Sequence, residues 1–146
     1  MNKILVTGGA GFIGSNLIEK LLKDKSIEKV ICVDNLDPFY EVAFKKYNIK
    51  NFFNSKKFIF YKTDIADLNS LVKIFKKEKP NYIIHLAAKA DTRNSVKNPY
   101  DYNKVNVLGT LHLLELAKDY GIKKFIFISS SSVYGNEARP PFKENE

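Results

Sequence analysis

The sequence is poor in cysteine and arginine and contains no long apolar run. Its one cysteine, Cys32, cannot form an internal disulfide, so we expect a protein of a reducing compartment such as the cytoplasm. None of its apolar runs approaches the ~20 residues that a helix needs to span a bilayer, and we therefore expect no association with a membrane. Only 2 of its 24 basic residues are arginine. Because arginine is preferred for the recognition of bases and phosphates, we expect no nucleic-acid partner.

The chain does have enough apolar sequence to form a core. Its 146 residues are 45% hydrophobic and carry a net charge of +8. This length is typical of one domain, which we place at residues 1–146, and the composition excludes disorder as the main state. The lysines are scattered over the expected helix faces and loop edges, which favours a solvated surface, and the remaining interpretation is attraction of an anionic small molecule.

Short β-rich runs alternate along the chain with longer stretches of helical periodicity. The expected strands are residues 3–7, 29–33, 57–61, 82–86 and 124–129. The expected helices are residues 11–25, 42–48, 67–77 and 100–120, the last ending at Gly121. This alternation predicts an α/β fold with a doubly wound parallel sheet. The runs 4–6, 30–33 and 125–128 are apolar throughout, which predicts strands covered by helices on both faces.

The most informative motif is the glycine-rich segment 7–14, Thr-Gly-Gly-Ala-Gly-Phe-Ile-Gly, between the first expected strand and helix. Gly9, Gly11 and Gly14 match G-x-G-x-x-G, and Gly8 with the last two matches T-G-x-x-G-x-x-G. Glycines there permit a tight turn and a close approach of the backbone to a pyrophosphate, and Gly14 permits close packing of the helix. The helix N-terminus then offers N–H groups to the phosphates.

Carboxylates follow the next two expected strands. Asp34 lies 20 residues after Gly14, where a carboxylate accepts hydrogen bonds from the adenosine ribose and repels a 2′-phosphate. This predicts NAD rather than NADP. Asp64 is either an acceptor for the adenine amino group, with Ile65 packed on the ring, or a turn residue. His85 and His112 have no further ligand at metal spacing, so we expect structural roles and no metal site.

Taken together, several segments resemble the extended short-chain dehydrogenase/reductase family, the NAD-dependent sugar-nucleotide epimerases and dehydratases. These segments are 7–14, Asp34-Asn35, Asp64-Ile65, 85–88 (His-Leu-Ala-Ala), 106–110 (Asn-Val-Leu-Gly-Thr) and 129–135 (Ser-Ser-Ser-Ser-Val-Tyr-Gly). Within the family the chain is most similar to UDP-glucuronate 4-epimerases. The aromatic and acidic stretch 34–40 matches that subfamily, and segment 85–95 is similar to its H-L-A-A-Q-A-G-V-R-Y-S. The departures from that motif are Lys89, Asp91, Thr92 and Asn94.

The resemblance implies a Rossmann-like domain, NAD as cofactor and a UDP-sugar substrate. The implied cofactor-binding residues are Gly8, Gly11, Phe12, Ile13, Gly14, Asp34, Asn35, Asp64, Ile65, Leu86, Ala87, Ala88 and Asn106. Ser130 corresponds to the family's catalytic hydroxyl, which would hydrogen-bond the sugar O4. Arg93, Ser131 and Ser132 are the implied substrate-binding residues, and Arg93 would face the carboxylate of a uronic acid. Because 4,6-dehydratases carry Asp and Glu at the two serine positions, the resemblance favours an epimerase.

The family's main acid/base group is a tyrosine in a Tyr-x-x-x-Lys pair, which the resemblance places just past Glu146. We therefore expect residues 1–146 to be an incomplete cofactor domain that lacks the last strands, the substrate domain and epimerase activity of its own. The parent protein is expected to be a cytoplasmic homodimer of nucleotide-sugar metabolism, with a role in polysaccharide biosynthesis. Relatives usually dimerise through the helix expected here at 100–120.

Three functions remain open at this point. The first is the N-terminal part of an enzyme that inverts C4 of a UDP-hexuronic acid through a transient 4-keto sugar. The second keeps that chemistry but takes a neutral UDP-sugar. The third is a non-catalytic NAD-binding module.

Overall fold

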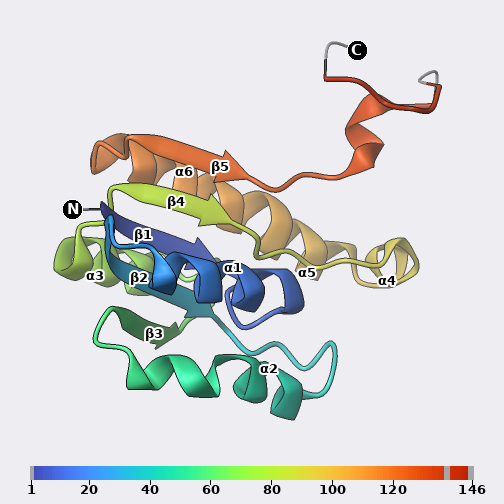
Figure 1. Cartoon of the computed structure of the whole chain (residues 1–146). Coiled ribbons are helices and arrows are strands. Elements are labelled where there is room, and N and C mark those ends of the chain that lie inside the picture. The colour runs from blue at the N-terminus through green and yellow to red at the C-terminus, as the bar shows by residue number, and fades with distance from the viewer. Residues whose placement is uncertain (1, 137–138, 145–146) are drawn as a thin grey trace.

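The computed structural model describes residues 2–136 and 139–144, and its strands form one parallel sheet. The strands are β1 (Asn2–Thr7), β2 (Ile27–Asp34), β3 (Phe58–Lys62), β4 (Tyr82–His85) and β5 (Lys124–Phe127). Their order in space is β3-β2-β1-β4-β5, and every neighbouring pair is parallel (Figure 1). The chain therefore winds outward from β1 in both directions, which confirms the predicted doubly wound, Rossmann-like sheet.

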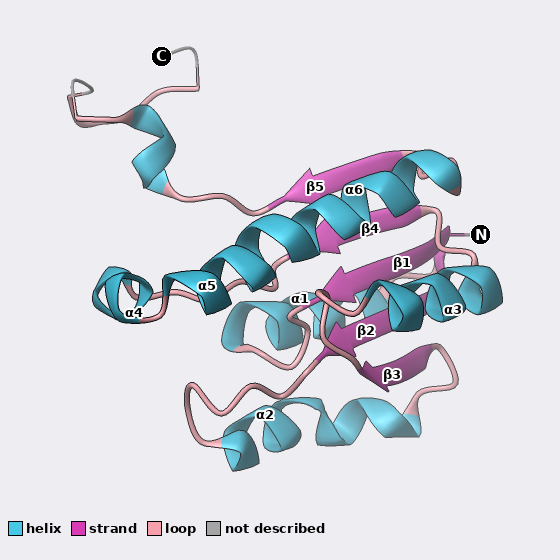
Figure 2. Cartoon of the chain, turned by 180° about the vertical axis from the view of Figure 1, so that it is seen from behind, coloured by secondary structure: helices cyan, strands magenta, loops and turns pink. Residues whose placement is uncertain are grey.

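Helices cover both faces of this sheet. On one face lie α1 (Phe12–Lys23), α2 (Val42–Ile49) and the short helix Lys50–Asn54, and on the other lie α3 (Leu68–Glu78) and α6 (Thr110–Asp119) (Figure 2). As predicted, Gly121 follows α6 with a positive φ of 61°. Asp67 caps α3 by accepting a hydrogen bond from the Ser70 N–H. No helix of the described ranges is both long enough and apolar enough to cross a membrane.

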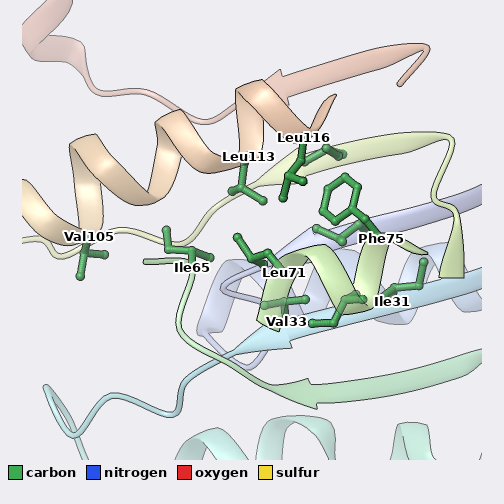
Figure 3. Close-up of a cluster of buried hydrophobic side chains, with 11 residues drawn as sticks. Ile31, Val33, Ile65, Leu71, Phe75, Val105, Leu113 and Leu116 are labelled. Atoms are coloured by element: carbon green, nitrogen blue, oxygen red, sulfur yellow. The ribbon is translucent and has the colours of Figure 1, made fainter. Parts of the chain in front are cut away.

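The core consists of two apolar layers, one on each side of the central strands. On one side Leu5 and Ile83 pack with Phe75 of α3 and Leu113 of α6 (Figure 3 shows the helix side chains). On the other side, alternate strand residues pack against Ile18 of α1. Burying each such side chain is worth about 1.5–3 kcal/mol. These layers hold the strands in place, and the loops at the carboxyl ends of the strands extend from this rigid sheet.

The predicted helix 100–120 is confirmed as a continuous helical stretch from Pro99 to Asp119, but a π-helical segment lies within it. It consists of α5 (Pro99–Tyr102), a π-helical segment Asn103–Gly109 and α6, and a further helix, α4 (Thr92–Lys97), precedes it. A Cβ at Gly109 would lie only 2.6 Å from the Ile65 Cγ1 atom. At this position the helix backbone therefore lies directly against the loop after β3. Such π-turns are frequent at functional sites.

The predicted burial of 125–128 on both faces is also wrong. Phe125 packs into the core beneath α6, but Ile126, Phe127 and Ile128 are 39%, 54% and 46% exposed. The strand itself ends at Phe127 rather than at residue 129. The reason is position: β5 is the edge strand of the described sheet, and only α6 reaches over it (Figure 2).

Candidate functional site

A cavity of about 490 Å³ opens at the carboxyl edge of the sheet. Its wall includes the residues at or just past the ends of all five strands, among them Gly8, Asp34, Thr63, Leu86 and Ile128. The cavity includes the carboxyl ends of β1 and β4, between which the strand order changes direction. In open α/β sheets this is the position at which ligands bind.

The glycine-rich loop forms the floor of the cavity. Gly8 has a φ of +67°, and a Cβ there would lie 2.8 Å from the Ala87 nitrogen. A Cβ at Gly14 would lie 2.3 Å from the Gly8 carbonyl oxygen, so a side chain at either position would force the loop away from its neighbours. Gly14 thus permits close packing of α1 against the loop itself. The predicted need for glycine is confirmed at both positions.

The N-terminus of α1 faces this cavity. Gly11 is the N-cap residue and offers no side chain to the first turn of the helix, so the N–H groups of that turn remain for a ligand. Phe12 and Ile13 line the cavity, and their side chains are 79% and 63% exposed. The dipole of the helix makes this end attractive to a phosphate group.

Asp34 is held in place by two backbone N–H groups, one from the glycine-rich loop and one from the loop after β2. The Ala10 N–H donates to Oδ2 at 3.0 Å, and the Leu36 N–H donates to Oδ1 at 2.8 Å. The residue is only 7% exposed but lines the cavity. Its neighbour Asn35 also lines the cavity and accepts a hydrogen bond from the Asp37 N–H at 2.9 Å. The predicted acidic group is therefore fixed next to the glycine loop.

Among the cavity residues near Asp34 that the prediction missed, two lie in contact with each other. Tyr40 and Lys45 both line the cavity, and the Lys45 ammonium lies 4.7 Å from the centre of the Tyr40 ring, within reach of a cation–π interaction. Lys45 is 8% exposed, which is rare for a lysine. Burial, together with the Asp34 charge, raises the pKa of Tyr40. Tyr40 is therefore not poised to act as a base.

Asp64 and Ile65 follow β3, and both line the cavity. Asp64 Oδ1 also accepts a hydrogen bond from the Ala66 N–H at 2.9 Å, so Asp64 forms a turn as well. The Ile65 carbonyl oxygen lies 3.3 Å from Nδ1 of His112. His112 thus holds a loop, in agreement with the structural role expected for it.

A buried hydrogen-bond relay connects the strand ends to the π-helical segment. His85 Nδ1 lies 2.6 Å from the Thr7 hydroxyl and its Nε2 lies 2.9 Å from the Thr110 hydroxyl. The Thr110 hydroxyl donates to the Asn106 carbonyl, so it must accept from Nε2–H. The Thr7 hydroxyl accepts from the N–H groups of Leu86 and Ala87 and therefore donates to Nδ1. This requires the neutral ring, and burial lowers the pKa of His85 to about 4.

Asn106 acts on the cavity wall from outside it. Its side-chain carbonyl accepts from the Lys89 N–H at 2.8 Å, and its amide donates to the Lys89 carbonyl at 2.9 Å. Asn106 itself is not among the residues that line the cavity, and its predicted contact with a cofactor stays a prediction. The side-chain oxygen and the NH₂ group of Asn106 are thus both bonded to the backbone of Lys89. The three residues before Lys89, namely Leu86, Ala87 and Ala88, do line the cavity.

The predicted substrate and catalytic residues lie outside the cavity. Ser130 caps the short helix Ser131–Tyr134, where its hydroxyl accepts from the Ser132 N–H at 3.2 Å. This helix follows β5 and stands away from the sheet (Figure 1). Arg93 lies on the exposed helix α4. The cavity is therefore large enough for a nucleotide, but these predicted side chains do not line it.

Comparison with known proteins agrees with this geometry. A family profile described as GDP-mannose 4,6 dehydratase matches residues 5–146. The chain belongs to this family. It is 43% identical to a UDP-glucuronate 4-epimerase of Thermodesulfobacterium geofontis, over 99% of this chain and 44% of that protein.

Solved structures of this family show the same fold. A UDP-Glc/GlcNAc 4-epimerase of Campylobacter jejuni superimposes with a TM-score of 0.86 at 32% identity, over 99% of this chain and 42% of that one. A UDP-glucose 4-epimerase of Thermus thermophilus, solved in complex with NAD, gives 0.74 at 36% identity, over 88% and 37%. The chain thus spans less than half the length of these relatives, and what it matches is their N-terminal, Rossmann-like portion.

Proposed function

We propose that this chain binds NAD in the cavity at the carboxyl edge of the sheet. The observation that carries the proposal is the joint placement of the glycine loop, the uncapped N-terminus of α1 and Asp34 around one space of about 490 Å³. Gly8 and Gly14 leave no room for a Cβ. The pyrophosphate would lie at the α1 N-terminus, and the carboxylate of Asp34 would accept hydrogen bonds from the adenosine ribose.

The reaction that we propose for the parent protein is inversion at C4 of a UDP-hexuronic acid through a transient 4-keto sugar. When bound, NAD supplies a hydride acceptor and donor at C4. Ser130 would hydrogen-bond the sugar O4, with Ser131 and Ser132 beside it in contact with the sugar, and Arg93 would pair with the uronate carboxylate. These roles require the segment after β5 and helix α4 to approach the sugar in the assembled protein.

One observation supports an epimerase rather than the dehydratase that the family description names. Ser131 and Ser132 carry no carboxyl group, so this segment has no acid/base pair for an elimination. Identity does not separate the two reactions, because relatives at 43% identity include both a UDP-glucuronate 4-epimerase and a dTDP-D-glucose 4,6-dehydratase. Since epimerases of neutral UDP-sugars also match, the uronate preference depends on Arg93.

The test uses the longest natural reading frame that contains these 146 residues. The purified protein is incubated with NAD and either UDP-glucuronate or UDP-glucose, and the C4 epimer is followed by NMR. We expect faster turnover of the uronate. Removing the charge in Arg93→Gln should reduce kcat/KM for the uronate by roughly 10-fold or more, the usual cost of a lost charged hydrogen bond, and leave that for UDP-glucose nearly unchanged.

Lys97→Gln is the matched control, because it removes another exposed cation from the same helix. Equal losses on both substrates in Arg93→Gln would contradict the uronate role and favour a neutral UDP-sugar. NAD binding without any epimerisation would favour a non-catalytic binding module.

A further inference from the structure

An ion-pair cluster joins two walls of the cavity. The Lys89 ammonium lies 3.1 Å from a carboxylate oxygen of Asp37 and 2.5 Å from one of Asp101. Asp37 belongs to the loop after β2, whereas Lys89 belongs to the segment after β4. Because β1 lies between these two strands, the Lys89–Asp37 pair crosses above the carboxyl end of β1.

This crossing lies where a dinucleotide would pass. Asp37 and Lys89 both line the cavity, together with Gly11 and Ile13 at the start of α1. A cofactor with its adenosine at Asp34 and its other half at Ala87 would run from one wall to the other beneath the ion pair. The side chains of Lys89 and Asp37 are only 20% and 25% exposed, so water screens this pair less than an ordinary surface pair.

Both ends of the crossing are fixed to the fold. Asn106 holds the backbone N–H and carbonyl of Lys89, and the Tyr102 hydroxyl donates to the carbonyl of the next residue, Ala90. At the other end, the Asp37 N–H donates to Asn35 Oδ1 at 2.9 Å. The hydrogen bonds to its two carboxylate partners raise the pKa of Lys89, which keeps the ammonium charged.

We propose that Asp37, Lys89 and Asp101 form an ionic strap that retains a dinucleotide in the cavity and limits its rate of release. The proposal rests on NAD binding as proposed above and adds a residue that holds the cofactor in place. Lys89 is also a departure of this chain from the resembling epimerase motif, which carries glutamine at this position. A chain with glutamine at this position, as in the motif, would not have the cation that the strap requires.

The test compares rates of NAD release from the 146-residue chain and its variants. Bound NAD is chased with excess of a fluorescent etheno analogue, and the dissociation and association rate constants are measured separately. In Lys89→Gln we expect release to be five- to tenfold faster, with association changed less than threefold, since the strap opposes exit. Raising the salt concentration should speed release from the wild type more than from the variant.

Asp37→Asn decides between the strap and direct contact of Lys89 with the pyrophosphate. If the strap retains the cofactor, loss of the Asp37 charge weakens the Lys89–Asp37 ion pair, and NAD is released faster, as in Lys89→Gln. If Lys89 instead binds the phosphates, removal of a competing carboxylate makes release slower. Slower release, or unchanged release in both variants, would overturn the strap.

Lys118→Gln is the matched control, because it breaks an exposed ion pair with Glu115 on α6, away from the cavity residues. Its release rate should equal that of the wild type. If the wild type binds no NAD at all, the proposed function itself fails, and the strap fails with it. NAD binding with an unchanged rate of release contradicts the strap alone.

Discussion

Acid should weaken the folded state through His85, which is 1% exposed and hydrogen-bonded as the neutral ring. Its ordinary pKa is 6.5 and burial lowers it to about 4. Between these values the unfolded chain binds a proton that the folded chain does not bind. The contribution of His85 to stability is therefore fully present above pH 6.5 and is lost progressively as the pH falls towards 4.

The expected size of this effect follows from the two pKa values. At about 1.4 kcal/mol for each pH unit, the loss amounts to about 3 kcal/mol of the free energy of unfolding. The structural cause is specific: a proton on Nδ1 would face the Thr7 hydroxyl, whose own proton already points at this nitrogen. Folding then requires either breaking that hydrogen bond or releasing the proton.

The assay is urea unfolding followed by circular dichroism at several pH values between 7.5 and roughly 4. The stability of His85→Gln should depend on pH less steeply than that of the wild type, because glutamine does not titrate. His112→Gln serves as the control, since His112 is the other histidine and forms one hydrogen bond to the Ile65 carbonyl. Parallel pH profiles for the wild type and His85→Gln would refute the reasoning.

Further predictions concern the cavity and its support. Gly14→Ala should weaken NAD binding by roughly 10-fold or more, because its Cβ would lie 2.3 Å from the Gly8 carbonyl oxygen; titration calorimetry measures this. Asn106→Ala should lower the free energy of unfolding by about 1–3 kcal/mol, because it leaves both backbone groups of Lys89 without their partner; urea unfolding at pH 7 checks it. The 146-residue chain alone should show no epimerase turnover, since no Tyr-x-x-x-Lys pair follows β5; an NMR assay with UDP-glucuronate would contradict this by detecting product.

Much of the fold follows from local patterns in the sequence. The apolar runs of β1, β2 and β4 are buried in the sheet, and the periodic helices α1 and α3 lie within a few residues of their predicted bounds. The glycine loop and Asp34 were predictable because a tight turn and a fixed carboxylate each require a particular residue type at a particular spacing.

Other features depend on contacts that no local pattern contains. Lys45 lies in a polar segment, and only the packing of α2 beside the cavity places it against Tyr40. The π-helical segment lies where Gly109 approaches Ile65, and these two residues are distant in sequence. The exposure of Ile126 follows from the place of β5 at the sheet edge, whereas its sequence predicts a buried strand.

The most direct test of the account is calorimetric titration of the chain with NAD and with NADP, before and after Asp34→Asn. We expect the wild type to bind NAD at least roughly 10-fold more tightly than NADP, because the Asp34 carboxylate bonds the ribose hydroxyls and repels a 2′-phosphate. The substitution should remove most of that preference, while Asp24→Asn, at an exposed carboxylate at the far end of α1, should leave it intact. Equal binding of NAD and NADP by the wild type, or an unchanged preference in Asp34→Asn, would contradict the account.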